Sequence, residues 1–117
     1  MKLDVRERFE RIFVFSKKIR DRAKGVTLEA YLKDELLQES IMYCLGQIGE
    51  IASKIPDEEQ EKYPNVFWDQ MIGLRHRLFH DYEAINFSKV YDITQQPIIN
   101  LVTELESILK VNDDEEH

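Results

Sequence analysis

Apolar residues recur every three or four positions along most of this 117-residue chain, and this spacing constrains the fold more than any other feature. An α-helix repeats about every 3.6 residues, so the spacing gathers the apolar side chains on one helical face. The chain contains only four Gly and three Pro, too few for an all-β domain with many turns. The sequence therefore predicts an all-α fold, an up-and-down bundle of four long helices plus a short extra helix.

Capping residues and proline divide the first half of the chain. A helix is predicted over residues 4–24, and Gly25 suits the left-handed conformation that ends many helices. Thr27 is a suitable cap for a second stretch over residues 28–55, as a short helix that leads into a long one. Pro56 ends that stretch.

The second half is divided in the same way. Residues 57–64 form an acidic connector with room for one helical turn, and Asn65 is the expected cap of a helix over residues 68–82. Asn86 or Ser88 caps a last helix, which reaches about residue 111 and is kinked or interrupted at Pro97. Residues 112–117 are expected to be a polar, frayed tail. Residues 1–117 are thus expected to form one helical domain.

Composition narrows the class of protein. Hydrophobic residues make up 43% of the chain, as is typical of a globular protein. No apolar run approaches the roughly 18 residues of a membrane span, and no signal-peptide segment is present. The single cysteine, Cys44, excludes an internal disulfide and a cysteine-based zinc site. We therefore expect a soluble cytoplasmic protein with no membrane partner.

Charge is unevenly distributed in a chain whose formal net charge is -7. Residues 1–25 carry nine Lys and Arg against four Asp and Glu, whereas the rest of the chain is strongly acidic. Phosphate contacts dominate nucleic-acid affinity, so an acidic protein is a poor general binder of nucleic acid and no DNA partner is expected. The first helix, together with Arg75 and Arg77, could still form a basic surface for RNA; the alternative is a merely solvated face.

The most unusual segment is residues 75–82, with the sequence Arg-His-Arg-Leu-Phe-His-Asp-Tyr. A helix advances about 100° per residue, which places Arg75 in the middle of an apolar stripe that runs from Trp68 to Tyr82. His76 and His80 lie together on one flank, at about 100° and 140° from Arg75. A cation on an apolar stripe requires an explanation.

Arg75 has three possible environments. An ionised side chain is rarely buried unless it is paired, so Arg75 faces either a buried acid or a polar cleft, or it covers apolar neighbours with its stem and extends its charge to water. If the helix over residues 28–55 is continuous, Asp34 lies on its apolar face and is the expected partner. The alternative is an Asp34 that faces solvent before a bend.

Arginine and histidine together suit cleavage of RNA. Arginine provides a permanent cation that matches phosphate, and histidine accepts or donates a proton near neutral pH. The 2′-hydroxyl of RNA can act as the nucleophile, giving a 2′,3′-cyclic phosphate and a 5′-hydroxyl without a metal. On a straight helix, however, Arg75 and His80 point about 140° apart. Either the helix ends or bends near His80, or a second copy of the chain completes the site across a two-fold axis.

A metal site is the less favoured interpretation. His76 and His80 are four residues apart, as in helical zinc pairs, but no third histidine or cysteine is near in the sequence. Arg77 follows His76 directly, which departs from the zinc motif H-E-x-x-H and opposes cation binding. We expect no metal and no other cofactor.

Four segments, in order, resemble the HepT-like toxins of the HEPN superfamily. They are Tyr31-Leu-Lys-Asp34, Leu45-Gly-Gln-Ile-Gly-Glu-Ile-Ala52, Trp68-Asp-Gln-Met-Ile-Gly-Leu-Arg75 and the Arg75-x4-His80-x-Tyr82 signature. Two positions depart from the family pattern: His76 stands where Asn is common, and Phe67 where Pro usually precedes the tryptophan. The resemblance covers about residues 4–110.

The resemblance implies a homodimeric, metal-independent ribonuclease encoded beside a minimal nucleotidyltransferase antitoxin. Arg75 and His80 would be catalytic, and Tyr82 would receive an adenylyl group from the antitoxin, which adds negative charge to the site. Asp34 and Glu50 would be polar supports near the cleft, with Arg77 beside them, and His76 could share the acid–base role.

Alternatives remain open at this level. Tyr82 could be a core aromatic whose hydroxyl reaches solvent, and Glu50 could be a solvated side chain. Gly46 and Gly49 lie on one side of their helix and indicate close helix packing, for which the interface between two copies of the chain is a candidate. The competing function is a non-catalytic nucleotide-binding or scaffold subunit of a nucleotidyltransferase complex, in which Arg75 binds a nucleotide phosphate.

Overall fold

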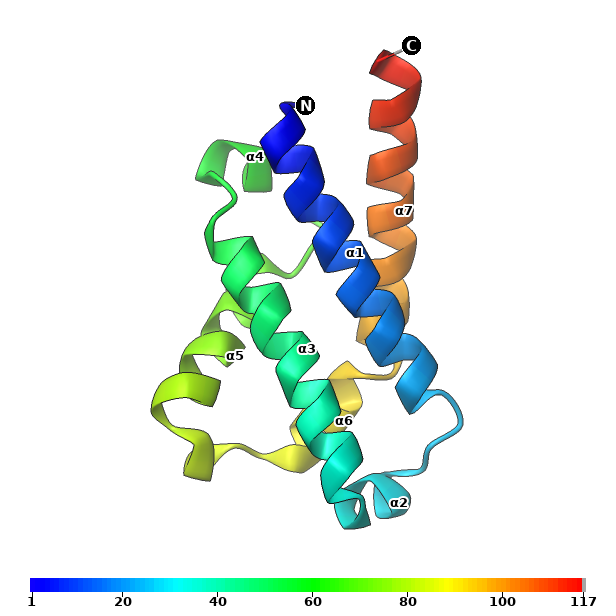
Figure 1. Ribbon diagram of the computed structural model, residues 1–117, viewed down its shortest axis with the longest axis vertical. Helices are drawn as coiled ribbons and strands as arrows, with labels where there is room; N and C mark the ends of the chain where they lie inside the picture. The colour runs from blue at the N-terminus through cyan, green and yellow to red at the C-terminus, as the bar shows by residue number, and fades with distance from the viewer. Residues whose placement is uncertain (117) are drawn as a thin grey trace.

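The computed structural model describes residues 1–116, and all its regular elements within that range are helices (Figure 1). The four longest are α1 (Leu3–Ala23), α3 (Glu35–Ser53), α5 (Trp68–His80) and α7 (Gln96–Glu116). The shorter elements are α2 (Leu28–Lys33), α4 (Asp57–Glu61), the 3-10 helix η1 (Tyr82–Ala84) and α6 (Phe87–Ile93). The predicted all-α bundle of four long helices is confirmed, but several short helices join them rather than one.

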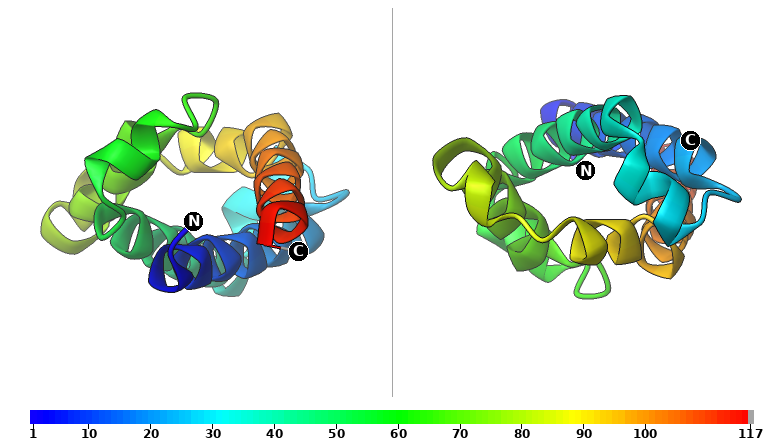
Figure 2. Two further views of the ribbon diagram at one scale, coloured as in Figure 1. Left: turned by 90° about the horizontal axis from the view of Figure 1, so that it is seen from above. Right: turned by 90° about the horizontal axis from the view of Figure 1, so that it is seen from below.

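The four longest helices alternate in direction along the bundle, as Figure 1 shows. Helix α1 packs between α3 and α7, and α3 packs on its other side against α5. The end-on views of Figure 2 show the helices around a common interior. Phe9 of α1 lies in this interior and makes edge-to-face contacts with Tyr63 and Trp68, at 5.4 and 5.7 Å between ring centroids. These contacts anchor the start of α5 to the core.

Most of the predicted breaks between helices are present. Gly25 has a φ of 75° and ends α1, because a residue without Cβ enters this region freely. Thr27 caps α2 by accepting a hydrogen bond from the Ala30 amide, and Asn86 caps α6 by accepting one from the Lys89 amide. Residues 57–61 form the single helical turn predicted in the acidic connector.

Two predicted boundaries of α5 are wrong. Phe67, and not Asn65, is the cap residue of α5, and no side chain bonds to the end of that helix. Helix α5 ends at His80, two residues before the predicted end. The predicted interruption of the last helix near Pro97 is present: residues 94–95 separate α6 from α7, and Pro97 lies in the first turn of α7, where a missing amide proton has little cost.

The predicted tail is also largely helical. Helix α7 continues to Glu116, beyond the predicted end near residue 111. Asn112 is 7% exposed and its amide nitrogen donates to the Ile108 carbonyl, so it packs as part of the helix. Residue 117 of the predicted tail lies outside the described residues. Among the described residues, no helix has both the length and the apolar character that a bilayer crossing would need.

Helices α3 and α5 approach most closely at Gly49. A Cβ atom built on Gly49 would lie 2.5 Å from the Arg75 Cβ and 2.6 Å from the Met71 carbonyl oxygen. One turn earlier, a Cβ on Gly46 would meet only the Leu78 Cδ1, at 3.6 Å. The close packing predicted for these glycines therefore occurs within the chain, where it sets the position of Arg75 on α3.

Alanine substitutions at two helical glycines should have opposite effects on stability. Gly49→Ala should lower the free energy of unfolding by about 1–3 kcal/mol, because the added methyl group meets backbone that cannot move away alone. Gly73→Ala is the matched control: its Cβ would meet nothing within 4 Å, and alanine favours a helix over glycine by about 1 kcal/mol. Urea unfolding of both variants measures the difference, and equal stability would contradict the close α3–α5 contact.

Candidate active site

Arg75 forms an ion pair with Glu50 where α5 lies on α3. Its Nη2 is 2.5 Å from the Glu50 Oε2, and the two side chains are 35% and 34% exposed. The Arg75 Nε is buried and has no hydrogen-bond partner among the described residues, and the guanidinium carbon lies 5.6 Å from the centre of the Phe79 ring. Arg75 is therefore held at the rim of the bundle, with its stem buried and part of its charge open to solvent.

The expected pairing of Arg75 with Asp34 is wrong. The chain leaves the helical conformation at Asp34, so α2 and α3 are separate helices and Asp34 does not lie on the apolar face. Its carboxylate instead accepts a hydrogen bond from the Leu37 amide, as the cap of α3, and is exposed. Glu50, for which a solvated side chain was equally expected, takes the place of Asp34 as the partner of Arg75. Glu50 also lies 3.4 Å from the Lys54 Nζ.

His80 is the last residue of α5 and contacts His76. Their ring centroids are 4.6 Å apart, and both side chains are exposed. The Asp81 amide closes the helix by donating to the Arg77 carbonyl at 2.8 Å. The helix thus ends at His80, but His80 is itself still helical, so the first of the two expected remedies does not turn it toward Arg75. Within the described part of the chain, no hydrogen bond links Arg75 to His76 or His80. In a single chain, Arg75 therefore contacts Glu50, while the two histidines lie on a different flank of α5.

Tyr82 lies in η1 and not on the face of α5 that carries Arg75. The predicted shared face required a longer helix, and the end of α5 at His80 removes it. Tyr82 is 51% exposed, with its ring edge toward Phe87 at 6.4 Å, so the core-aromatic alternative is wrong. Phe79, predicted on the apolar stripe, is 66% exposed.

An apolar groove includes Phe79, the ring that lies next to the Arg75 guanidinium. It has a volume of about 350 Å³ and is lined by residues of α3, α5 and η1, among them Tyr43, Phe79 and Tyr82. Tyr43 is 61% exposed. Exposed aromatic side chains gathered in one groove are typical of a surface that contacts another molecule.

The Tyr31–Asp34 segment supports the fold rather than the Arg–His segment. Tyr31 is 1% exposed, and its ring lies 5.6 Å from that of Tyr91, whose hydroxyl donates to the Val26 carbonyl. The Tyr31 hydroxyl has no hydrogen-bond partner among the described residues. Burial, with a smaller effect from Tyr82, raises the pKa of Tyr31 to about 12, so this tyrosine stays neutral near pH 7.

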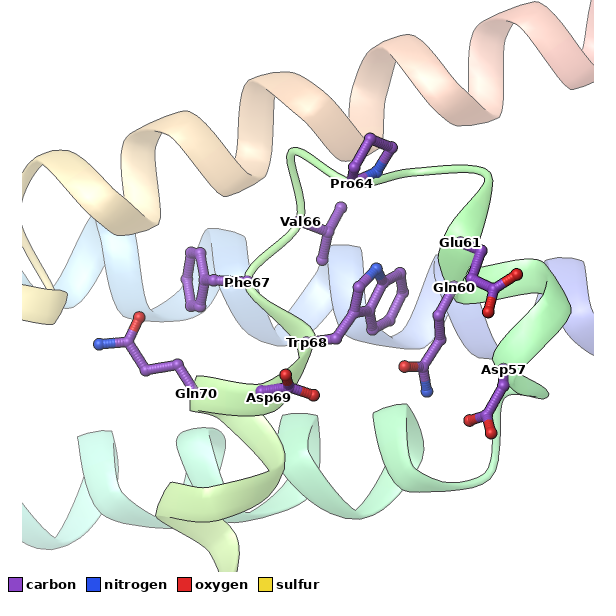
Figure 3. Close-up of a pocket in the computed structure, with 9 residues that line it drawn as sticks. All are labelled: Asp57, Gln60, Glu61, Pro64, Val66, Phe67, Trp68, Asp69 and Gln70. Carbon is purple, nitrogen blue, oxygen red and sulfur yellow. The ribbon is translucent and has the colours of Figure 1, made fainter.

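A larger hollow lies at the other end of α5 (Figure 3). It has a volume of about 550 Å³, with Phe67 and Trp68 in its wall. Asp57, Glu61 and Asp69 line it and no basic residue does, so it repels phosphate. Within residues 1–116, no group of three or more His, Cys, Asp or Glu side chains is placed to hold a metal ion.

Comparison with known proteins places the chain in a family. The family described as "Ribonuclease HepT-like" matches residues 12–109, which include Arg75, His80 and Tyr82. A "Putative RNase" of Methanocaldococcus jannaschii is 35% identical over 109 residues, or 93% of this chain and 90% of that protein. Another "Putative RNase", from Caldanaerobacter subterraneus, is 30% identical over 90 residues, or 77% and 80% of the two chains.

A more distant relative carries the family name. A "Probable ribonuclease HepT" of Thermococcus cleftensis is 25% identical over 107 residues, or 92% of this chain and 91% of its own. No solved structure matches the chain. The family match covers most of the sequence and includes the complete Arg–His–Tyr signature, and the chain therefore belongs to the HepT-like ribonucleases.

Proposed function

We propose that this protein is a metal-independent RNA endonuclease, and that it is the toxin of a toxin–antitoxin pair in the cytoplasm. Membership of a ribonuclease family supports RNA as the substrate class. The observation that carries the proposal is the Arg75–Glu50 pair, which holds a partly exposed guanidinium at a fixed place, on the same helix as the exposed His80.

Each group has a role in the proposed reaction. His80 takes the proton of a ribose 2′-hydroxyl, whose oxygen then bonds to the adjacent phosphorus. Arg75 stabilises the negative charge of the phosphorane. The bond from phosphorus to the 5′-oxygen breaks and that oxygen takes up a proton, which gives a 2′,3′-cyclic phosphate and a 5′-hydroxyl end. His76, in contact with His80, is placed to share the proton transfer.

Two copies of the chain are needed for this geometry. Arg75 and His80 occupy different flanks of α5, so a two-fold arrangement would bring Arg75 of one copy toward His80 of the other. Tyr43 and Phe79 of the apolar groove, with Phe79 next to the Arg75 guanidinium, give the second copy an apolar surface to cover. We therefore propose a homodimer with composite sites.

The proposed antitoxin is a minimal nucleotidyltransferase. Tyr82 is half-exposed in η1, two residues after His80, and its hydroxyl can take an adenylyl group. The added phosphate would place a negative charge beside the histidine and repel RNA. Binding of the antitoxin over the same surface would block RNA by occlusion, and both effects can act together.

The first test removes the proposed catalytic groups. Arg75→Ala and His80→Ala should each lower the rate of cleavage of total RNA by about 100-fold or more, with EDTA present throughout. Melting temperature serves as the control for folding. If both variants cleave like the wild type, the proposal fails; if the wild type binds nucleotides but cleaves no RNA, the non-catalytic subunit is the better interpretation.

The second test concerns the orientation of Arg75. Glu50→Gln should lower kcat by about 10- to 100-fold, because the guanidinium loses its fixed position, while stability changes by no more than about 1 kcal/mol. Lys54→Ala removes the other partner of Glu50 and is the matched control, with activity near that of the wild type. Higher activity in Glu50→Gln would mean that Glu50 masks Arg75 instead of positioning it.

The third test concerns Tyr82. Co-expression with a minimal nucleotidyltransferase should add the mass of at least one adenylyl group to the wild type and to Tyr43→Phe, but not to Tyr82→Phe. Tyr43 is the matched control because it is also an exposed tyrosine beside the same groove. Intact-mass spectrometry gives the result, and an adduct that persists in Tyr82→Phe would exclude this residue as the site.

A further inference from the structure

The flank of α5 that faces away from α3 borders a cavity of about 450 Å³, which we name the α5–α6 cavity. Leu74, Ile85, Val90 and Ile93 give it an apolar floor between α5, η1 and α6. Sites for small molecules commonly measure about 300–1,000 Å³ and combine apolar walls with a few polar groups. The cavity is therefore large enough for one nucleotide.

Two cations without partners stand at the edge of this cavity. Arg77 of α5 and Lys89 of α6 are exposed, and within residues 1–116 neither side chain forms an ion pair. Asp69 is the one acid that lines the cavity, so the local charge remains positive in an acidic protein. The side-chain oxygen of Asn86, which lines the cavity, accepts a hydrogen bond from the Lys89 amide, so its side-chain amino group is available as a donor. These groups suit a ligand with a phosphate and a polar base.

Gly73 lines the same cavity, and the fold of the chain does not require it. It is exposed in the interior of α5, where glycine weakens a helix relative to alanine. Its φ is not positive, since Gly25 is the positive-φ glycine of the described chain, and a Cβ here would meet nothing within 4 Å. Gly73 therefore leaves this part of the cavity wall open, and a large side chain at the same position would extend into the cavity.

The cavity and His80 share one side of α5. The helical repeat places Gly73, Arg77 and His80 at about 160°, 200° and 140° from Arg75, within about 60° of one another. A strand with its reacting phosphate at His80 would thus pass over Arg77 and reach Gly73 along the same flank.

We propose that the α5–α6 cavity is a subsite for the nucleotide next to the cleaved phosphate in single-stranded RNA. The inference rests on the proposed ribonuclease function and specifies its substrate as unpaired RNA. The apolar floor receives the base and ribose, and Arg77 with Lys89 binds the backbone phosphate. Unpaired RNA is favoured because its bases can turn out of the strand into a cavity, whereas those of a duplex cannot.

Binding of an RNA that cannot be cleaved tests the subsite apart from catalysis. The probe is a single-stranded 2′-O-methyl oligonucleotide of mixed sequence, followed by fluorescence anisotropy over a range of salt concentrations. Gly73→Leu fills the cavity and Lys89→Ala removes a cation, and each should weaken binding about tenfold. Lys89→Ala should also reduce the slope of log K against log salt by about 0.7, the value for one phosphate contact in a single strand.

Two matched variants serve as controls. Ser107→Leu adds the same side chain at an exposed position of α7, and Lys110→Ala removes an exposed lysine of that helix, both away from the cavity. Both should bind within about twofold of the wild type, as expected for surface changes outside an interface. If Gly73→Leu does not fold, the result for Lys89→Ala tests the subsite by itself. The Lys89 side chain is exposed, so its removal should leave the fold intact.

Failure of the subsite can be told apart from failure of the ribonuclease. If the wild type cleaves RNA, and Gly73→Leu and Lys89→Ala bind the probe as tightly as the wild type, the subsite proposal is wrong and the ribonuclease proposal is retained. If the wild type neither binds the probe nor cleaves RNA, both are overturned. If Gly73→Leu breaks up a dimer in sedimentation while Lys89→Ala binds normally, the cavity is a protein contact and the subsite is overturned.

Discussion

The contact between α3 and α5 at Gly49 determines where the charged groups of this protein lie. The two backbones are so close that a Cβ atom on Gly49 would overlap both the Met71 carbonyl and the Arg75 stem. A contact this tight fixes the register of one helix on the other, because sliding or rotating α5 would bring other side chains against the same point. The residue after Gly49 is Glu50. The helix register that places Gly49 against α5 therefore also brings the Glu50 carboxylate to the Arg75 guanidinium.

Stability alone does not account for Arg75. An ion pair that is one-third exposed contributes about 0–1 kcal/mol, since solvent screens it and two long side chains must be ordered. The buried, unpartnered Nε costs about 1–3 kcal/mol, which is as large or larger. An apolar side chain at this position would pack on α3 without that cost. The arrangement is explained if the guanidinium is held, partly open to solvent, for a ligand that carries negative charge.

The sequence was sufficient for the order of the four long helices and for close packing at Gly49, because these follow from periodicity and from the absence of a side chain. It was insufficient where tertiary contacts decide between local possibilities. From the sequence, Asp34 could either continue a helix or cap one. In the structure it caps α3, and Glu50 is the partner of Arg75. The end of α5 at His80 is marked by no Gly or Pro, so the face assigned to Tyr82 could not be predicted from the repeat. The cavity beside Gly73 was also missed, although a glycine in an exposed helix interior was a signal for it.

The net charge of -7 does not prevent this protein from binding RNA, because the relevant charges are local. At physiological ionic strength, exposed charges are screened over about 8 Å, whereas a 13-residue helix such as α5 is about 20 Å long. The acidic side chains around the hollow at the start of α5 are therefore largely screened from the far end of that helix. At that end, Arg75 lies on one flank of the helix and Arg77 on another, while the exposed Asp81 and Glu83 follow His80, so the positive charge is confined to these flanks. Acidic surfaces elsewhere on the protein repel phosphate, so these local cations would favour RNA at this end of α5 over the rest of the surface.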